Sequence, residues 1–498
     1  MEHVRKKMAT GVFWMASARM IVRALGALST LILARLLAPS DFGLIAMATS
    51  LIALLELLSA FSFDLALIRR PDSTSDDFDT AWTLNVLFAT GIAIALFISA
   101  PFAADFYHEP RLQTVIYLVA AGNCLRAFNN IGTVEFRKQL QFDRDFRLQV
   151  FQKLSQVVIA VPLAFAWRSY WALIAGMIAG NIASLIVSYW MVPRRPRFML
   201  KSTGDLFSFS GWVALNNAIT FMRNRAGDLI IGRIAGTRML GLFNVAYEIS
   251  NLPSTEMVAP INRAVFPGYV QLAQDPQQLR KAFRDVLSFV CMLTLPVCLG
   301  IAATAELLVP LLLGDKWIES APLVALLAIS GALNTLQANT GAVYHALSKP
   351  RLIALTGGIQ MIVLMPMLIY SAHHYGVVGA ATAHLIHSVI FGVPVTYSIL
   401  VRSTPIRWSD FLRSTWRPIV AAALMYTWVR LAVFSTLLAP FGTVTRIAAC
   451  AALGVISYAL AVLILWQLSG KPQGAETMMA NLAARWVRAR WSGLKSAA

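Results

Sequence analysis

Several arginines of this sequence lie inside long apolar stretches, where charged side chains are rare. Arg19 and Arg23 are four residues apart in the first stretch, so on a helix they share one face. The planar guanidinium of arginine can donate to two oxygens of one phosphate or carboxylate. The residues that we expect to bind an anionic substrate in this way are Arg19, Arg23, Arg126, Arg223 and Arg225.

Fewer acidic residues share these apolar stretches. Glu56, Asp228 and Glu248 are the candidates, and two roles remain open for them. They could carry a coupling ion, or they could pair with the arginines for purely structural reasons. Because the charge inside the apolar stretches is basic on balance, the pattern favours an anionic substrate over a cationic one.

Two histidines share a helix face further along the chain. His384 and His387 are three residues apart, a spacing compatible with a metal site or a proton relay. No cysteine or carboxylate nearby supports a metal site, so we predict no metal and expect these rings to pack at the level of the lipid headgroups. The sequence has no phosphate-binding glycine loop, and we expect no cofactor.

The elements that must position these residues are membrane helices. The chain is 58% hydrophobic and 13% charged, whereas soluble proteins carry about 25% charged residues. Apolar runs of about 20 residues recur along it, each long enough to cross a bilayer. The sequence therefore predicts an all-α integral membrane protein with fourteen transmembrane helices.

Basic residues orient these helices. Lys and Arg concentrate on alternate connections, for example around 194–201 and 402–417. Cytoplasmic connections carry such an excess, so we expect both termini to lie in the cytoplasm. The net charge of +18 then indicates contact with anionic lipid headgroups rather than with nucleic acid.

The sequence also contains an internal repeat. RLLAPSDFGLIAMA at 35–48 and RIAGTRMLGLFNVA at 233–246 align without a gap, 198 positions apart. Six predicted helices separate the copies, so both copies have the same orientation, as in transporters built from parallel repeats. The sequence predicts four parts of the chain: an N-terminal six-helix lobe at 1–200, a C-terminal six-helix lobe at 201–405, two additional transmembrane helices at 406–470, and a basic amphipathic cytoplasmic tail at 471–498.

The repeated motif contains Arg35 and Gly43 in the first copy, and Arg233 and Gly241 in the second. We expect the arginines to lie at the outer edge of the membrane, where their heads reach phosphates. The glycines would permit a tight start of the next helix. This motif is therefore expected to be architectural rather than ligand-binding.

Parts of both repeats resemble a known family. Three stretches carry the resemblance: GVFWMASARM, LILARLLAPSDFGLIAMA and DLIIGRIAGTRMLGLFNVAYEISNLP. They are similar to bacterial polysaccharide-export flippases of the multidrug/oligosaccharidyl-lipid/polysaccharide flippase superfamily. The resemblance implies translocation of undecaprenyl-diphosphate-linked oligosaccharides for exopolysaccharide, capsule or lipopolysaccharide O-antigen synthesis. It implies lipid-linked glycan and membrane lipids as partners, and makes polysaccharide polymerase and export machinery candidate partners.

Two other functions remain open at this point. An ion-coupled multidrug exporter of the same fold would favour an acidic cavity, in contrast to the basic one expected here. A membrane glycan polymerase or ligase would need a sizeable outer loop for its chemistry, and the longest polar connections run to only about a dozen residues. We therefore expect a transporter and not an enzyme.

Overall fold

The structure is a computed structural model, and it describes most of the chain. The described residues are 2–56, 67, 73–201, 203–435, 440–472, 474 and 477. Within these ranges the side chains are described as well, except at 2–13, 16, 56 and 203–226. The predicted amphipathic tail lies outside the described residues beyond Thr477.

The described part of the chain is helical and contains no strand. Ten of its segments are long and apolar enough to cross a membrane, and α2 (Pro39–Glu56) is a shorter apolar helix. A helix satisfies its backbone hydrogen bonds internally, which is the requirement for a segment surrounded by lipid. The chain is therefore a membrane protein with multiple spans.

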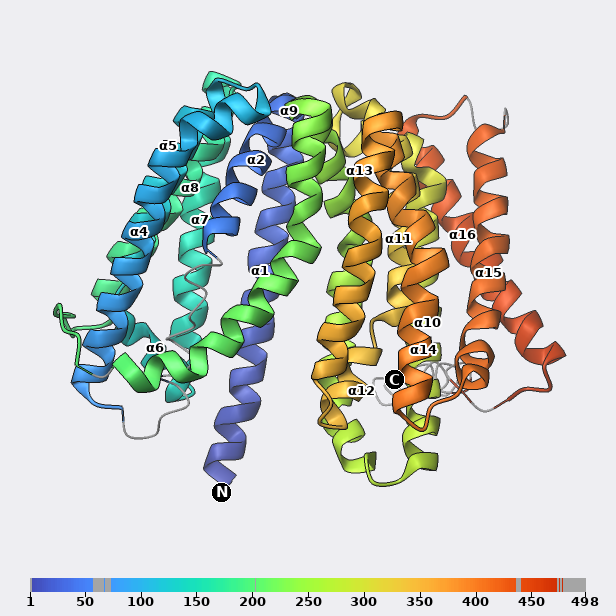
Figure 1. The fold of residues 1–498 in the computed structure, drawn as a ribbon. Coiled ribbons are helices and arrows are strands. Elements are labelled where there is room, and N and C mark those ends of the chain that lie inside the picture. The colour runs from blue at the N-terminus through green and yellow to red at the C-terminus, as the bar shows by residue number, and fades with distance from the viewer. Residues whose placement is uncertain are drawn as a thin grey trace, which may run out of the picture. The chain divides into compact units, whose positions relative to one another are not determined.

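The chain divides into two compact units. The first unit comprises residues 1–244 together with 312–316. Its helices α4 and α5 lie side by side, as do α7 and α8, while α1 packs along α7 (Figure 1). Its elements are α1 (Glu2–Leu36), α2, α4 (Ser75–Tyr107), α5 (Arg111–Ala127), η2 (Ile131–Thr133), α6 (Val134–Lys138), α7 (Phe142–Trp167), α8 (Trp171–Met191) and the first part of α9 (Thr203–Leu272).

The second unit comprises residues 245–311 and 317–498. In it, α15 packs against α16 and α11 packs against α13. Its elements are the rest of α9, α10 (Pro276–Leu313), η3 (Asp315–Ser320), α11 (Ala321–Gln337), α12 (Thr340–Ala346), α13 (Arg351–His387), the π-helical turn η4 (Ser388–Gly392), α14 (Val393–Ser403), α15 (Trp408–Phe434) and α16 (Thr443–Leu468).

Two of the long helices are interrupted by a glycine. Gly236 in α9 has φ 77° and ψ 179°, and Gly376 in α13 has φ 62° and ψ −150°. This backbone region is essentially restricted to glycine, because a Cβ would clash there. Each of these helices is therefore two helical segments that meet at a sharp break.

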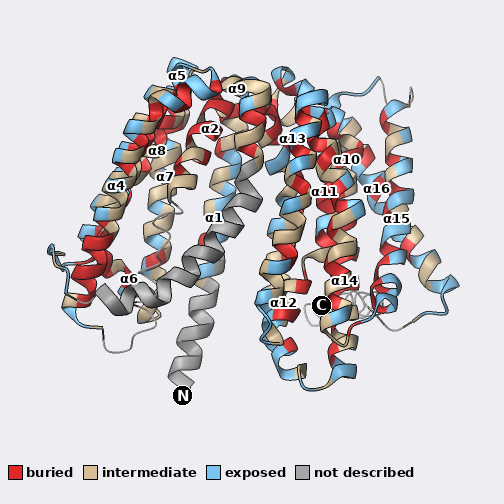
Figure 2. Ribbon diagram, viewed as in Figure 1, coloured by how far each residue is buried: buried red, intermediate tan, exposed pale blue. Residues whose placement is uncertain are grey.

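Burial in both units follows the pattern of a protein in lipid. Many fully buried positions hold small residues such as Ala34, Ala48 and Ala172, whereas large apolar side chains such as Trp190 and Leu468 are exposed (Figure 2). Small residues let membrane helices approach closely, and the apolar side chains that remain outside can contact lipid tails. This distribution agrees with the high mean hydropathy of the chain, +0.65.

Candidate functional site

A basic strip runs along α1 in the first unit. Arg19 and Arg23 are both exposed and lie one turn apart on this helix. Lys153 of α7 lies beside the same helix, because its Cε is 3.5 Å from where a Cβ at Gly26 would be. A charged group within a membrane span does not face lipid without a large penalty. Because both arginines are exposed, we expect a water-accessible surface along α1.

Lys153 is an addition to the residues expected from sequence. In the structure the side chain lies against α1, and its Nζ donates to Gln156 Oε1 at 3.1 Å. Contact between the aromatic rings of Trp14 and Phe146, with centroids 5.0 Å apart, also joins α1 to α7.

The other predicted anion-binding arginines lie on different helices. Arg126 is exposed in the last turn of α5. Arg223 and Arg225 lie in the first part of α9, and their side chains are outside the described residues. The structure thus places Arg19, Arg23 and Lys153 along the helix pair α1 and α7. That Arg126, Arg223 and Arg225 bind the same anion stays a prediction.

Asp228 is a buried carboxylate in the first unit, with 7% of the residue exposed. The Ser50 hydroxyl donates to its Oδ2 at 3.1 Å, and the Asn244 amide is 3.4 Å from its Oδ1. Uncharged donors of this kind compensate part of the cost of burying a carboxylate. Of the other candidate acids, Glu248 is exposed on α9, and the side chain of Glu56 lies outside the described residues.

The repeated glycines make the closest backbone contact in this region. A Cβ at Gly43 would lie 1.7 Å from the carbonyl oxygen of Thr237, and a Cβ at Gly241 would lie 1.9 Å from that of Pro39. Pro39 and Thr237 are themselves equivalent positions of the repeat, 198 residues apart. The contact, which we call the glycine crossing, is therefore reciprocal between the two copies.

This geometry gives the glycines a different role from the one expected from sequence. Gly43 and Gly241 are not needed for a tight helix start, because neither has a positive φ. They are needed because any side chain would collide with the backbone of the other copy. Small residues serve close helix contacts in membrane proteins in the same way.

Cationic side chains surround the turn between α1 and α2. Arg35 donates from Nε to the carbonyl oxygen of Leu312 at 3.2 Å, and Lys316 Nζ lies 3.2 and 3.1 Å from the carbonyl oxygens of Leu36 and Leu37. A cation at the last carbonyls of a helix also complements the helix dipole. These contacts tie residues 312–316 to the end of α1.

The second repeated arginine makes a different contact. The guanidinium of Arg233 lies over the ring of Phe106, 5.0 Å from its centroid, in a cation–π arrangement. The glycines of the repeat thus keep equivalent contacts in the two copies.

An ion pair occupies the connection between α4 and α5, close to the glycine crossing. Arg111 donates to both carboxylate oxygens of Glu109, at 2.8 and 2.9 Å. These hydrogen bonds from Arg111 hold the pKa of Glu109 below its ordinary value. The Thr237 hydroxyl is 3.5 Å from Glu109 Oε2, so this charged pair borders the backbone of the second repeat copy.

Comparison with known proteins decides the family. A family described as polysaccharide biosynthesis protein matches residues 32–322, which is more than half of the chain. The chain belongs to this family. The matched range contains both copies of the repeated motif and the glycine crossing, and it confirms the family resemblance seen in the sequence.

Alignments with individual relatives cover most of the chain. The chain is 24% identical over 422 residues to the lipopolysaccharide biosynthesis protein WzxC of Escherichia coli (strain K12), covering 83% of this chain and 85% of that protein. It is 23% identical over 449 residues to the succinoglycan biosynthesis transport protein ExoT of Rhizobium meliloti (strain 1021), covering 87% and 88%.

A solved structure shows the fold. The lipid II flippase MurJ in an inward closed conformation superposes with a TM-score of 0.73 at 12% identity, covering 92% of this chain and 99% of that one. The chain therefore has the all-helical fold of this membrane transporter, as the sequence predicts at the level of fold class.

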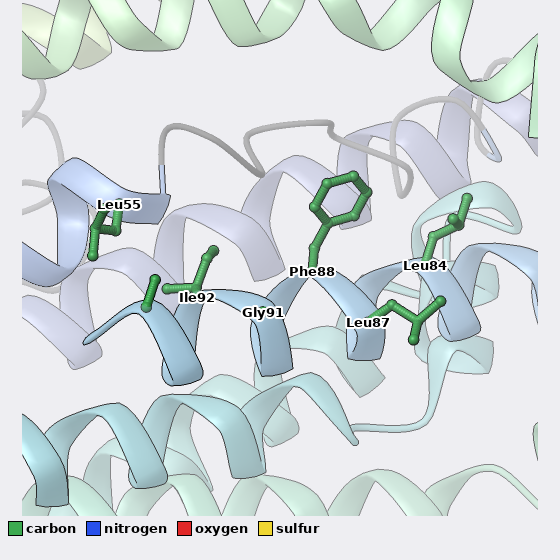
Figure 3. A pocket seen from close by; sticks show the side chains of 7 residues that line it. Leu55, Leu84, Leu87, Phe88, Gly91 and Ile92 are labelled. Atoms are coloured by element: carbon green, nitrogen blue, oxygen red, sulfur yellow. The ribbon is translucent and has the colours of Figure 1, made fainter. Parts of the chain in front are cut away.

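An apolar pocket of about 390 Å³ lies in the first unit of this family member (Figure 3). Leu55 of α2 contributes one side, and the rest of the lining comes from one stretch of α4: Leu84, Leu87, Phe88, Gly91, Ile92 and Ala95. None of the described residues that line it is charged, so this part of the pocket suits hydrocarbon rather than a phosphate. In the described part of the chain, no group of three His, Cys, Asp or Glu residues could hold a metal ion.

Substitutions at Asp228 separate its two possible roles. We expect Asp228→Asn to keep near-normal export, because the amide retains an acceptor and the Ser50 hydroxyl can turn to accept from it. Asp228→Ala should destabilise the protein by about 1–3 kcal/mol, since buried donors lose their acceptor. Export in a strain lacking the gene and thermal unfolding in detergent measure both effects. Lost export with normal stability in Asp228→Asn would instead make the charge itself essential.

Proposed function

We propose that this protein is a flippase that moves undecaprenyl-diphosphate-linked oligosaccharide repeat units across the bacterial inner membrane. The repeat units would serve exopolysaccharide, capsule or lipopolysaccharide O-antigen synthesis. The observation that carries the proposal is the family match over residues 32–322. The relatives named for lipopolysaccharide biosynthesis and succinoglycan transport, and the flippase fold, support it.

The basic strip on α1 is the proposed contact for the diphosphate. Arg19 and Arg23 share one face of a helix that has the length and hydropathy of a membrane span, and both are exposed. Two guanidinium groups one turn apart can each donate to phosphate oxygens. Lys153 would add a third positive charge without a preferred direction. Arg126, Arg223 and Arg225 stay in the proposal as further anion-binding residues.

We propose fourteen transmembrane helices with both termini in the cytoplasm, in two six-helix lobes at 1–200 and 201–405 followed by two additional helices at 406–470. The breaks at Gly236 and Gly376 support this count, because each divides one long apolar helix into two segments. In this arrangement the turn between α1 and α2, with Arg35 and Lys316, would lie at the outer edge of the membrane.

Reporter fusions test the topology. Fusions after residues 200 and 405 should both report the cytoplasm, because Lys and Arg concentrate on those connections. A paired phosphatase and fluorescent reporter at each position gives opposite signals for the two compartments. A periplasmic signal at either position would overturn the proposed orientation.

The driving force follows from the charge of the substrate. A diphosphate carries roughly two negative charges, and outward movement of both would gain about 4.6 kcal/mol at 100 mV, since each charge is worth about 2.3 kcal/mol. We expect flipping of a lipid-linked oligosaccharide in proteoliposomes to accelerate when the acceptor side is made positive, with no requirement for ATP. The assay measures access of an added glycosidase to labelled substrate.

Two outcomes of this assay would redirect the proposal. Transport that ignores the potential and needs an ion gradient would indicate electroneutral exchange. Failure to move any lipid-linked glycan, together with efflux of organic cations, would favour the multidrug exporter. Protein-free liposomes and the Arg19→Ala, Arg23→Ala variant serve as controls in the same assay.

A further inference from the structure

A π-helical turn interrupts the helix pair α13–α14 in the second unit. Residues Ser388–Gly392 form this turn, between His387 at the end of α13 and Val393 at the start of α14. Single π-helical turns inside α-helices are rare, and they often occur at functional sites. Their wider hydrogen-bond register leaves backbone carbonyls that need partners from neighbouring side chains.

Polar side chains from three helices meet at this turn. Gln360 Nε2 lies within hydrogen-bonding distance of Gly392 O at 3.1 Å, Gln337 Oε1 at 3.0 Å and Thr396 Oγ1 at 2.8 Å. The Thr396 hydroxyl donates onward to Gln337 Oε1 at 2.7 Å. Helices α11, α13 and α14 are thus joined by amide and hydroxyl groups within an otherwise apolar bundle.

His387 is the buried ionisable member of this polar network, with 6% of the residue exposed. Its Nε2 is 3.1 Å from the backbone carbonyl oxygen of Gln360. Because a carbonyl can only accept, this contact assigns the ring hydrogen to Nε2 and leaves Nδ1 as the atom that takes up a proton. The ring of Phe391 stacks near it, with centroids 6.4 Å apart.

The partner of His387 was not expected from the sequence. Packing at the level of the lipid headgroups was the expectation for His384 and His387; in the structure His387 is buried, and its ring nitrogen contacts a backbone carbonyl of the α13 segment that precedes the break at Gly376. The spacing of the two histidines does not predict that Gln360, which lies 27 residues earlier, is the partner of His387.

Protonation of His387 would place a positive charge in an uncharged environment. The titratable groups that face this region, among the described residues, are His384 one turn earlier and Tyr247 of α9, whose ring centroid is 6.1 Å from that of His384. Neither supplies a negative charge at neutral pH. Because a buried charge without a counter-ion is strongly disfavoured, the protonated ring would favour a conformation that opens the network to water.

We propose that His387 is a proton-binding site that couples the proton gradient across the membrane to the transport cycle. Nδ1 takes up one proton from the outer side in one conformation and releases it to the cytoplasm in another, so each cycle restores the neutral ring and moves one proton inward. A proton can shift the equilibrium between two conformations only if the two conformations bind it with different affinities. The inference rests on the proposed flippase function, to which it adds a proton as a second driving force.

The test measures proton binding without any glycolipid. Proteoliposomes adsorbed on a solid-supported membrane are exposed to jumps from neutral to mildly acidic pH, the range in which histidine titrates. We expect a transient charge displacement in the wild-type protein and its loss in His387→Gln. Glutamine keeps an N–H donor for the Gln360 carbonyl, so this variant should fold.

His374→Gln is the matched control. His374 lies on the same helix, outside the network, and its ring packs at a tilt against that of Tyr370, with centroids 4.5 Å apart. This variant should keep the wild-type signal. If His387→Gln does not fold, nitrogen-15 spectra of histidine-labelled wild-type protein provide the second measurement, in which one ring must titrate together with a conformational change.

The possible results separate this inference from the flippase proposal. Unchanged charge displacement in folded His387→Gln would overturn the inference, and so would the absence of any displacement or coupled histidine titration in the wild type. Neither result would affect glycolipid flipping driven by the membrane potential, which the glycosidase assay measures independently.

Discussion

Gly43→Ala should abolish polymer export, because the added methyl group cannot be accommodated at the glycine crossing. Its Cβ would lie 1.7 Å from the carbonyl oxygen of Thr237, and this obstacle is backbone rather than a flexible side chain. Forcing an extra methyl group into close-packed structure costs about 1–3 kcal/mol and sometimes more. Export in a strain lacking the gene, protein abundance by immunoblot and the thermal unfolding midpoint in detergent measure the effect.

The structure provides two comparisons for this variant. Gly241→Ala should behave like Gly43→Ala, because its Cβ would meet the Pro39 carbonyl oxygen at 1.9 Å. Gly91→Ala in α4 should be tolerated, since no described residue lies within 4 Å of its Cβ position. Normal export and an unchanged unfolding midpoint in Gly43→Ala would contradict the contact.

The double variant Arg19→Ala, Arg23→Ala should also abolish export, but at normal protein abundance. Removal of both guanidinium groups takes away the charge that would attract the diphosphate and the donors that would orient it. Because both residues are exposed on α1, their truncation leaves no cavity in a packed core. The measurements are export and abundance, with flipping in proteoliposomes as the direct assay.

Arg19→Lys, Arg23→Lys distinguishes charge from geometry. Lysine keeps the positive charge but loses the planar pair of donors, so this variant should recover part of the lost export. Full export by the double alanine variant would exclude these residues from substrate binding. Loss of the protein instead would indicate that the arginines serve structural pairing.

For the repeated glycines, the positions could be predicted from the sequence, but the reason for glycine could not. Gly43 and Gly241 stand out because self-alignment at 198 positions matches them without any structure. The reason for glycine did not follow from the motif, since a tight turn and a close helix contact both select the same residue type. Only the neighbouring carbonyls of Thr237 and Pro39 decide between these explanations.

The hydrogen-bond partners of polar residues could not be predicted from the sequence. Asp228 is recognisable from sequence as an acid in an apolar stretch, but Ser50, which donates to it, is 178 residues away. The same applies to the contact between Arg35 and Leu312, which are 277 residues apart. Helical periodicity indicates which side of a helix a residue occupies, whereas its partner depends on how the helices are placed.

Helix length was predictable where apolar runs were continuous. Helices such as α8 and α16 follow directly from uninterrupted hydrophobic stretches. The breaks at Gly236 and Gly376 needed backbone angles, because glycine occurs within membrane helices without interrupting them. The π-helical turn at 388–392 likewise has no distinct composition, so His387 could not be recognised as buried.

The glycine crossing has a consequence for the origin of the chain. Gly43 approaches the backbone at Thr237 in the way that Gly241 approaches the backbone at Pro39. A surface that meets an equivalent copy of itself reciprocally has the symmetry of an isologous homodimer interface. A polypeptide containing one repeat alone would therefore present both halves of this contact, and two such polypeptides could associate through it before a gene fusion joined them.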